Sequence, residues 1–223
     1  MKITYWSDFA CPYCYIGNTR LKKAITELGL EDKIEFDIRA FELDQNAPKN
    51  VSSTTVERFS EKYQISIDEA KREVENISKL GQAEGIDFKY ASTLYTNTFD
   101  AHRLMKYAEN INPELVSVLS EKLFDAYFTK NQKLADTEVL VGICDEIGLD
   151  VRDVLKSDKY ASEVRQDEEI ALINGIHGVP FYLIDGKYSI PGALSYEDFK
   201  KVLTQTLSEI TSSEKCEDGF CRL

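Results

Sequence analysis

The sequence has no apolar run approaching the ~20 residues needed to cross a membrane, so we expect no membrane-spanning helix. Its opening segment, Met1–Asp8, also has no apolar stretch of the length that a secretion signal requires. We therefore expect a cytoplasmic protein. Basic residues are scarce, because 27 Lys and Arg against 39 Asp and Glu give a net charge of −12. This balance argues against a nucleic-acid partner, since phosphate binding needs clustered Lys and Arg.

Cysteine and histidine are also few, with five and two residues respectively. In a reducing cytoplasm, cysteines are more often catalytic or metal-binding than structural, and an odd number leaves one outside any pairing within the chain.

Hydrophobic residues make up 43% of the sequence and charged residues 30%, an ordinary balance that predicts a packed core. We find neither an internal repeat nor a low-complexity segment.

The pattern of residues in the first part of the chain predicts a strand, a helix and a second strand, in that order. Residues 3–8 alternate and are rich in aromatic and β-branched types, which predicts a strand. A helix should begin at the cysteines, with Pro12 in its first turn and Gly29 as its stop. Residues 34–40 alternate again. This order predicts a βαβ unit with a parallel pair of strands.

A long helical stretch follows an irregular segment at residues 42–53, and the end of the chain returns to strands. Residues 181–185 and 188–190 predict a hairpin around Asp185–Lys187. Ser195 with Asp198 predicts the start of a last helix, after which the chain should loosen beyond Thr211. The outline is an α/β fold with a four-stranded mixed sheet at about 1–50 and 175–210, a helical insertion at about 54–174 and a tail at 211–223.

The pair Cys11 and Cys14 carries the strongest chemical signal, because it lies between a strand and a helix start. The unpaired N–H groups and the dipole of a helix stabilise a thiolate there. Cys11, at the exposed end, is then the attacking thiol, and Cys14 resolves the mixed disulfide. The same spacing also occurs in zinc sites, but two further ligands would be needed. We expect no metal.

Pro180 opens the third expected strand. A cis bond before it would set the backbone of Val179 beside the cysteines, where it could pair with a substrate chain as an added strand. A trans proline that ends a loop is the alternative, and the spacing alone does not choose between them.

The combined motifs resemble the DsbA family, and within it the FrnE-like cytoplasmic branch. The resemblance runs in the same order over about residues 1–210. It rests on four segments: Ser7–Gly17, Asn97–Leu104, Gly178–Phe181 and Ile190–Ala193.

This resemblance implies a thioredoxin-like fold with a helical insertion, with Cys11 as the attacking thiol, Cys14 as the resolving thiol and Pro180 as a cis-proline facing them. In periplasmic members a histidine stands where this sequence has Tyr13. A cationic neighbour of the thiolate is then lost, which predicts a less oxidising protein. The tail beyond the shared domain carries a further pair, Cys216 and Cys221.

Several other residues have two interpretations each. Cys216 and Cys221 could form a second redox pair or be idle thiols. His177 could favour the Cys11 thiolate, or lie in a surface loop. Asp8 could shuttle a proton for Cys14, or cap the helix.

Two residues are expected in the interior of the protein. His102 could line a groove under the insertion, or be a hydrogen-bonded structural residue. Cys144 falls on an apolar helix face and should pack in the core.

The sequence therefore predicts an enzyme that exchanges disulfides with protein substrates and reduces or isomerises disulfides formed under oxidative stress. No tightly bound cofactor is expected, although glutathione could serve as reductant. Kappa-class glutathione transferases and 2-hydroxychromene-2-carboxylate isomerases have a similar first strand, so a glutathione-dependent transferase or isomerase is the alternative. They typically place serine where Cys11 stands. A non-enzymatic binding module with an apolar groove is a third hypothesis. The sequence does not predict an oligomeric state.

Overall fold

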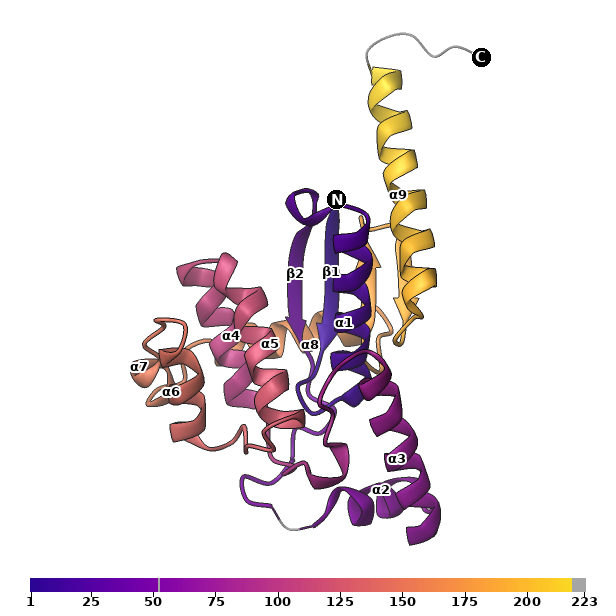
Figure 1. Cartoon of the computed structure of the whole chain (residues 1–223). Helices are drawn as coiled ribbons and strands as arrows, with labels where there is room; N and C mark the ends of the chain where they lie inside the picture. Colours follow the sequence, from indigo (N-terminus) through magenta and orange to yellow (C-terminus); the bar gives the residue numbers. More distant parts are fainter. Residues whose placement is uncertain (52, 218–223) are drawn as a thin grey trace.

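A computed structural model of the chain describes residues 1–51 and 53–217 (Figure 1). Its strands are β1 (Lys2–Ser7), β2 (Glu35–Ala40), β3 (Phe181–Ile184) and β4 (Tyr188–Pro191). Its helices are α1 (Pro12–Glu27), α2 (Thr55–Tyr63), α3 (Ile67–Ala83), α4 (Phe99–Ile111), α5 (Glu114–Phe128), α6 (Thr137–Asp145), α7 (Arg152–Leu155), α8 (Ala161–Ile173) and α9 (Tyr196–Glu217). Single-turn 3-10 helices lie at Glu31–Lys33 and Tyr90–Ser92.

The four strands form one mixed sheet in the order β2-β1-β3-β4. β1 pairs with β2 in parallel and with β3 antiparallel, and β3 pairs antiparallel with β4. The predicted fold class is therefore confirmed. The hairpin between β3 and β4 turns at Asp185 and Gly186, both with positive φ (53° and 68°), as the sequence indicates.

Helices cover both faces of the sheet (Figure 1). On one face Ile3 and Tyr5 of β1 pack with residues of α1 and α9, among them Leu21 and Phe199. On the opposite face Trp6 packs against Ala171 of α8. Because side chains alternate along a strand, neighbouring residues of β1 reach two different helical layers.

Helix α1 lies very close to the sheet at Gly17. A Cβ atom at this position would lie 2.5 Å from Tyr182 Oη of β3 and 3.1 Å from Ala193 Cβ. Only a residue without a side chain leaves room for this approach. The helix that begins at the cysteines is thereby fixed against β3, the strand that follows Pro180.

Helices α2–α8 follow β2 in the chain and precede β3. The arrowheads of β1 and β2 point towards α2 and α3 in Figure 1, so the loop after β1 meets these helices. Cys11 and Cys14 belong to the same buried apolar cluster as Leu104 of α4 and Phe124 of α5. The cysteine segment is therefore part of the core of the helical insertion as well as the start of α1.

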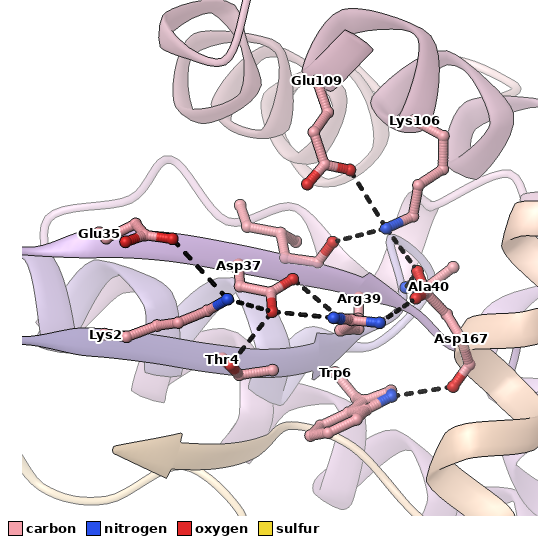
Figure 2. A network of polar contacts seen from close by, with 11 residues as sticks. Lys2, Thr4, Trp6, Glu35, Asp37, Arg39, Ala40, Lys106, Glu109 and Asp167 are labelled. Carbon is pink, nitrogen blue, oxygen red and sulfur yellow. Dashed lines mark hydrogen bonds and ion pairs between the residues drawn. The ribbon is translucent and has the colours of Figure 1, made fainter. Parts of the chain in front are cut away.

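A network of charged side chains joins this insertion to the edge of the sheet (Figure 2). The Asp167 carboxylate of α8 forms ion pairs with Lys106 Nζ of α4 at 2.6 Å and with Arg39 Nη1 of β2 at 3.0 Å. Arg39 also pairs with Asp37 at 2.8 Å, and Asp37 pairs with Lys2 at 3.1 Å. The buried Asp167 carboxylate thus connects two helices of the insertion with β2, and Asp37 extends the network to β1.

The last helix differs from the expected loosening after Thr211. α9 continues without a break to Glu217, so Cys216 falls in its last turn. Ser195 and Asp198 exchange two hydrogen bonds at its start, as the sequence predicts. Cys221 lies outside the described residues, and the second redox pair stays a prediction.

Candidate active site

The two cysteines lie at the amino end of α1. Cys11 is the residue that precedes the helix, Pro12 is in its first turn, and no described side chain caps it. The turn closes with hydrogen bonds from Cys11 N to Asp8 O (3.0 Å) and from Cys14 N to Cys11 O (3.1 Å). First-turn N–H groups of a helix have no partner within the helix. The sulfur of Cys11 therefore stands where the helix end favours an anion.

Cys11 is less exposed than the sequence suggests. Its exposed fraction is 3%, against 1% for Cys14, and neither thiol is in a disulfide. The expectation of an exposed Cys11 is wrong because helices of the insertion cover this end of α1. Cys11 Sγ donates to the carbonyl oxygen of Val179 at 3.5 Å, and the Val179–Pro180 peptide bond is cis. The structure thus brings Pro180 and Val179 to the cysteines.

A cavity of about 380 Å³ opens beside Cys11 and is not lined by Cys14. Its walls come from the cysteine turn, α2, α3 and the segment around the second 3-10 helix. Aromatic rings are prominent among its lining residues, which are Ala10, Cys11, Pro12, Tyr13, Leu43, Arg58, Phe59, Lys62, Tyr63, Glu73, Ile77, Tyr90, Tyr95 and Val179. A ligand in this cavity can therefore reach the Cys11 sulfur but not the Cys14 sulfur.

Two cations reach the same cavity from α2. The Arg58 guanidinium lies over the Tyr95 ring, 3.3 Å from its centroid, and Lys62 lies 5.7 Å from the centroid of Tyr63. Arg58 Nε is buried and has no hydrogen-bond partner among the described residues. Sequence reasoning missed these residues because helical periodicity in α2 gives no sign of which distant segment its polar face meets.

Cys14 lies deeper and in a different environment. Burial raises the pKa of its thiol well above the usual value, and contact with Cys11 raises it further. The N–H of Asp8 and the hydroxyl of Ser7 oppose this rise only in part. Cys14 is therefore a protonated thiol at neutral pH.

Asp8 is a buried, ionised carboxylate. Its Oδ1 accepts from Thr98 Oγ1 at 2.8 Å and from Ala10 N at 3.2 Å, and its Oδ2 accepts from Leu43 N at 2.8 Å. His102 Nε2 lies 3.5 Å from Oδ1. Burial opposes ionisation, but His102 and the backbone donors outweigh it and hold the pKa of Asp8 below its usual range. Asp8 binds the turn before the helix rather than capping the helix itself.

The other residues singled out in the sequence differ in their exposure and in their distance from the cavity. Tyr13 is 43% exposed at the rim of the cavity, whereas His177 is exposed and does not line it. His102 is buried beside Asp8. Cys144 is fully buried in α6, and burial raises the pKa of its thiol to about 12. Cys144 therefore packs in the core, as expected.

Neither a metal cluster nor a membrane span is found in the part of the chain that the structure describes. In residues 1–51 and 53–217, His, Cys, Asp and Glu side chains do not gather in groups of three or more that could hold a metal ion. Over the same residues, every helix is too short or too polar to cross a membrane.

Comparison with known proteins decides the family. Residues 2–204 match the DSBA-like thioredoxin domain. The chain belongs to the DSBA-like thioredoxin domain family. The resemblance that the sequence motifs carry is therefore confirmed at the level of this family, while placement in its FrnE-like branch stays a prediction.

Similar proteins agree with this family. A probable DsbA oxidoreductase from Streptomyces coelicolor is 34% identical, with a TM-score of 0.86 over 94% of this chain and 91% of that one. The uncharacterised protein YwbO of Bacillus subtilis is 24% identical over 91% of this chain and 95% of its own length. These matches span nearly the whole molecule, so the helical insertion belongs to the shared fold.

More distant structures share the fold alone. The cytosolic disulfide reductase DsbM of Pseudomonas aeruginosa is 14% identical, with a TM-score of 0.64 over 93% of this chain and 99% of that one. A 2-hydroxychromene-2-carboxylate isomerase is also 14% identical, with a TM-score of 0.68 over 96% and 98%. One fold thus carries both a disulfide reductase and an isomerase, and the choice between them depends on the site.

Proposed function

We propose that this protein exchanges disulfides with protein substrates through Cys11 and Cys14. The observation that carries the proposal is the difference between the two thiols. Cys11 borders the cavity at the amino end of α1, while Cys14 lies below it with a raised pKa. Cys11 is therefore the thiol that a substrate disulfide meets, and Cys14 is the thiol that stays protonated until a mixed disulfide forms.

The exchange has two steps. The Cys11 thiolate attacks one sulfur of the substrate disulfide and forms a mixed disulfide, while the other substrate sulfur leaves as a thiolate. The Cys14 sulfur then attacks Cys11, closes the Cys11–Cys14 disulfide and releases the second substrate thiolate. Two electrons pass from the cysteine pair to the substrate, and the reverse sequence oxidises a dithiol. Val179 lies beside Cys11, where its backbone can align an extended substrate chain.

Tyr13 supports the reducing direction. It replaces the cationic neighbour that the family resemblance associates with oxidising members, and its pKa is raised by burial, so it stays neutral at physiological pH. A neutral neighbour stabilises the thiolate less, which favours a dithiol that gives up its electrons more readily. We therefore propose reduction or isomerisation of stress-induced disulfides in the cytoplasm, where thioredoxin-type dithiols are kept reduced.

Glutathione chemistry is the second candidate. The cavity volume of about 380 Å³ suits a small ligand, and its two cations, Arg58 and Lys62, suit a carboxylate. The fold is shared with 2-hydroxychromene-2-carboxylate isomerase and with DsbM, of which a structure with glutathione is known. A glutathione-dependent isomerase or transferase would keep its activity when Cys14 is replaced, whereas a disulfide reductase acting through the pair would not.

Insulin reduction tests the leading proposal. The protein should accelerate reduction of insulin disulfides by dithiothreitol or glutathione, and Cys11→Ser should fall to the rate of the reductant alone. Cys144→Ala is the matched control, because Cys144 is also a buried cysteine but lies in the core of the insertion. Equal turnover by Cys11→Ser and the parent would refute the proposal.

A further inference from the structure

Arg58 of α2 differs from the other arginines in the interior of the described chain. Each of the others that is buried or partly buried lies 2.6–2.8 Å from a carboxylate oxygen: Arg20 from Glu84, Arg39 from Asp37, and Arg103 from Asp100. Arg58 is also partly buried, but it has no ion pair among the described residues, and its buried Nε has no hydrogen bond. A buried donor without an acceptor costs free energy, so this guanidinium calls for a physical explanation.

The groups closest to the Arg58 guanidinium are phenols. It lies over the Tyr95 ring, 3.3 Å from the centroid, and it lines the same cavity as Tyr90. Burial holds the pKa of both phenols above the usual value, so neither is an anion at physiological pH. Asp44 accepts a hydrogen bond from Tyr95 Oη at 3.0 Å, and Asp8 also acts on this phenol. Neither carboxylate forms an ion pair with Arg58 among the described contacts.

Stacking on Tyr95 orients Arg58 but leaves its donors available. A guanidinium interacts with an aromatic ring through its flat face, whereas its N–H groups point outward in its own plane. Those N–H groups match the two oxygens of a carboxylate, and such charge-assisted hydrogen bonds are the stronger kind. Because the ring already holds the side chain, little further ordering is needed when a carboxylate binds. Arg58 is therefore a pre-organised anion-binding group.

The cavity brings this group to the reactive thiol. Arg58 and Cys11 line the same space of about 380 Å³. Lys62, one turn further along α2, lines it too and has no ion pair in the described part of the chain. Of the described residues that line the cavity, Glu73 of α3 is the one carboxylate, and it is exposed and paired with neither cation. In a chain of net charge −12, the cavity beside Cys11 thus has more cations than carboxylates.

We propose that Arg58 is a specificity-determining residue that binds an acidic side chain of the substrate beside the disulfide that Cys11 attacks. This role rests on the proposed function and adds its substrate class, which is protein disulfides flanked by Asp or Glu. The cavity volume lies near the lower end of the roughly 300–1,000 Å³ of small-ligand pockets, so it takes a side chain or two rather than a folded domain. Val179 lines the cavity as well, so a chain aligned along its backbone can place a side chain there.

The preference acts at contact distance. The net charge of −12 opposes the approach of acidic substrates, but at physiological salt exposed charges are screened beyond about 8 Å. A carboxylate seated on Arg58 is partly buried and is screened much less. It holds the substrate disulfide near the Cys11 sulfur and fills the vacant hydrogen-bonding capacity of the guanidinium. We therefore expect a faster first step of exchange for acidic substrates, with the chemistry of that step unchanged.

Peptides with one activated disulfide test this preference in the full chain. Each has blocked termini and one cysteine in a mixed disulfide with 2-thiopyridine, a leaving group without a carboxylate. The residue beside the cysteine is Glu, Gln or Lys, and a fourth peptide combines Gln with a free terminal carboxylate. Absorbance of the released 2-thiopyridone gives the second-order rate constant of the first step. The rate with Cys11→Ser is subtracted, and the result is divided by the rate with dithiothreitol to remove the intrinsic reactivity of each peptide.

We expect the parent to react roughly tenfold faster with the Glu peptide than with the Gln peptide, as one hydrogen-bonded charge pair allows. Arg58→Gln should lose this preference and keep the parent's rate with the Gln peptide, whereas a structural defect would slow all peptides alike. Lys62→Gln should lower the preference less, because Lys62 is exposed. Arg72→Gln is the matched control, since it removes an exposed arginine of α3 that does not line the cavity. It should keep the full preference.

Equal rates of the parent with the Glu, Gln and Lys peptides would overturn this role, and so would a preference that Arg58→Gln retains. A preference for the free terminal carboxylate alone would also overturn it and would assign the cavity to small thiols. Should Arg58→Gln fold poorly, Arg58→Lys replaces it, because an ammonium lacks the planar fork. An undiminished preference in that variant would reject the role of the guanidinium.

Failure of the proposed function gives a different result. If Cys11→Ser releases 2-thiopyridone as fast as the parent, exchange does not pass through Cys11, and the proposed function fails together with the role of Arg58. If the parent reacts through Cys11 but does not distinguish the peptides, the role of Arg58 alone is rejected.

Discussion

Two buried carboxylates, Asp8 and Asp167, lie near the sheet and differ in the charge of the groups that bind them. Asp8 is 2% exposed and is bound by backbone N–H groups, a hydroxyl and a histidine. Asp167 is 3% exposed and is bound by the permanent cations Lys106 and Arg39, together with the backbone N–H of Ala40. Both charges are satisfied, but of the two carboxylates only Asp8 has a histidine beside it among the described contacts.

The difference separates a reactive end of the molecule from a structural one. Beside the cysteines, two backbone N–H groups and a hydroxyl bind the Asp8 carboxylate, and a histidine adjoins it. At the edge of β2, two cations and a carboxylate join α4, α8 and the sheet in a fixed arrangement (Figure 2). Substitutions at the first carboxylate should change exchange chemistry, and substitutions at the second should change stability alone.

The largest stability effect is expected at Asp167. In Asp167→Asn the Lys106 ammonium keeps only its 3.3 Å contact with the partly exposed Glu109 as an ion pair. Removing one partner of a buried pair leaves an uncompensated charge, so the free energy of unfolding should fall by about 3 kcal/mol. Urea denaturation measures this change. Asp68→Asn, at an exposed pair with Lys71, is the control and should be neutral. Unchanged stability of Asp167→Asn would reject the structural role.

A smaller stability effect, coupled to activity, is expected at Asp8. Asp8→Asn replaces one acceptor oxygen with an amide that opposes the donors around it, and we expect a loss of about 2 kcal/mol in the free energy of unfolding. The folded pKa of Asp8 lies below the unfolded value of ~3.9. Its contribution is therefore present above about pH 4 and is lost as the pH falls through the folded value.

Denaturation of Asp8→Asn and the parent at a series of pH values checks both statements. The stability difference should be largest at neutral pH and should narrow in acid. Exchange by Asp8→Asn should also slow, because Asp8 accepts from the N–H of Ala10, next to Cys11. A difference that is constant over the whole pH range would show that the Asp8 charge makes no contribution.

The smallest effect is expected at the exposed end of the charged network. Lys2 Nζ lies 3.1 Å from Asp37, but its side chain is 48% exposed. Exposed pairs contribute little, so Lys2→Ala should change the free energy of unfolding by at most about 0.5 kcal/mol and leave exchange rates unchanged. A loss comparable with that of Asp167→Asn would mean that the network acts as one unit along its full length.

Local chemistry made much of the fold predictable. Strand alternation located β1 and β2, Pro12 located the start of α1, and Asp185 with Gly186 located the hairpin turn. Each of these signals depends on neighbours within a few residues. The placement of Cys11 and Cys14 at a helix start follows from the same kind of signal.

The surroundings of the cysteines were not predictable from such patterns. Burial of Cys11 depends on α2 and α3, which begin more than 40 residues later in the chain. The ion pair between Arg39 and Asp167 spans 128 residues. His177 lies three residues before Pro180 in sequence but is exposed, because nearness in sequence does not fix the direction of a side chain. Contacts of this kind come from tertiary packing.

Trapping the mixed disulfide tests the central claim most directly. Cys14→Ser is incubated with insulin, alkylated, and mapped under non-reducing conditions by mass spectrometry. Because Cys11 is the thiol beside the cavity, the account predicts an insulin chain attached to Cys11, and no adduct at Cys14 in the reciprocal Cys11→Ser variant. Insulin attached to Cys144 or a tail cysteine instead, or attached to Cys14 in Cys11→Ser as readily as to Cys11 in Cys14→Ser, would contradict it.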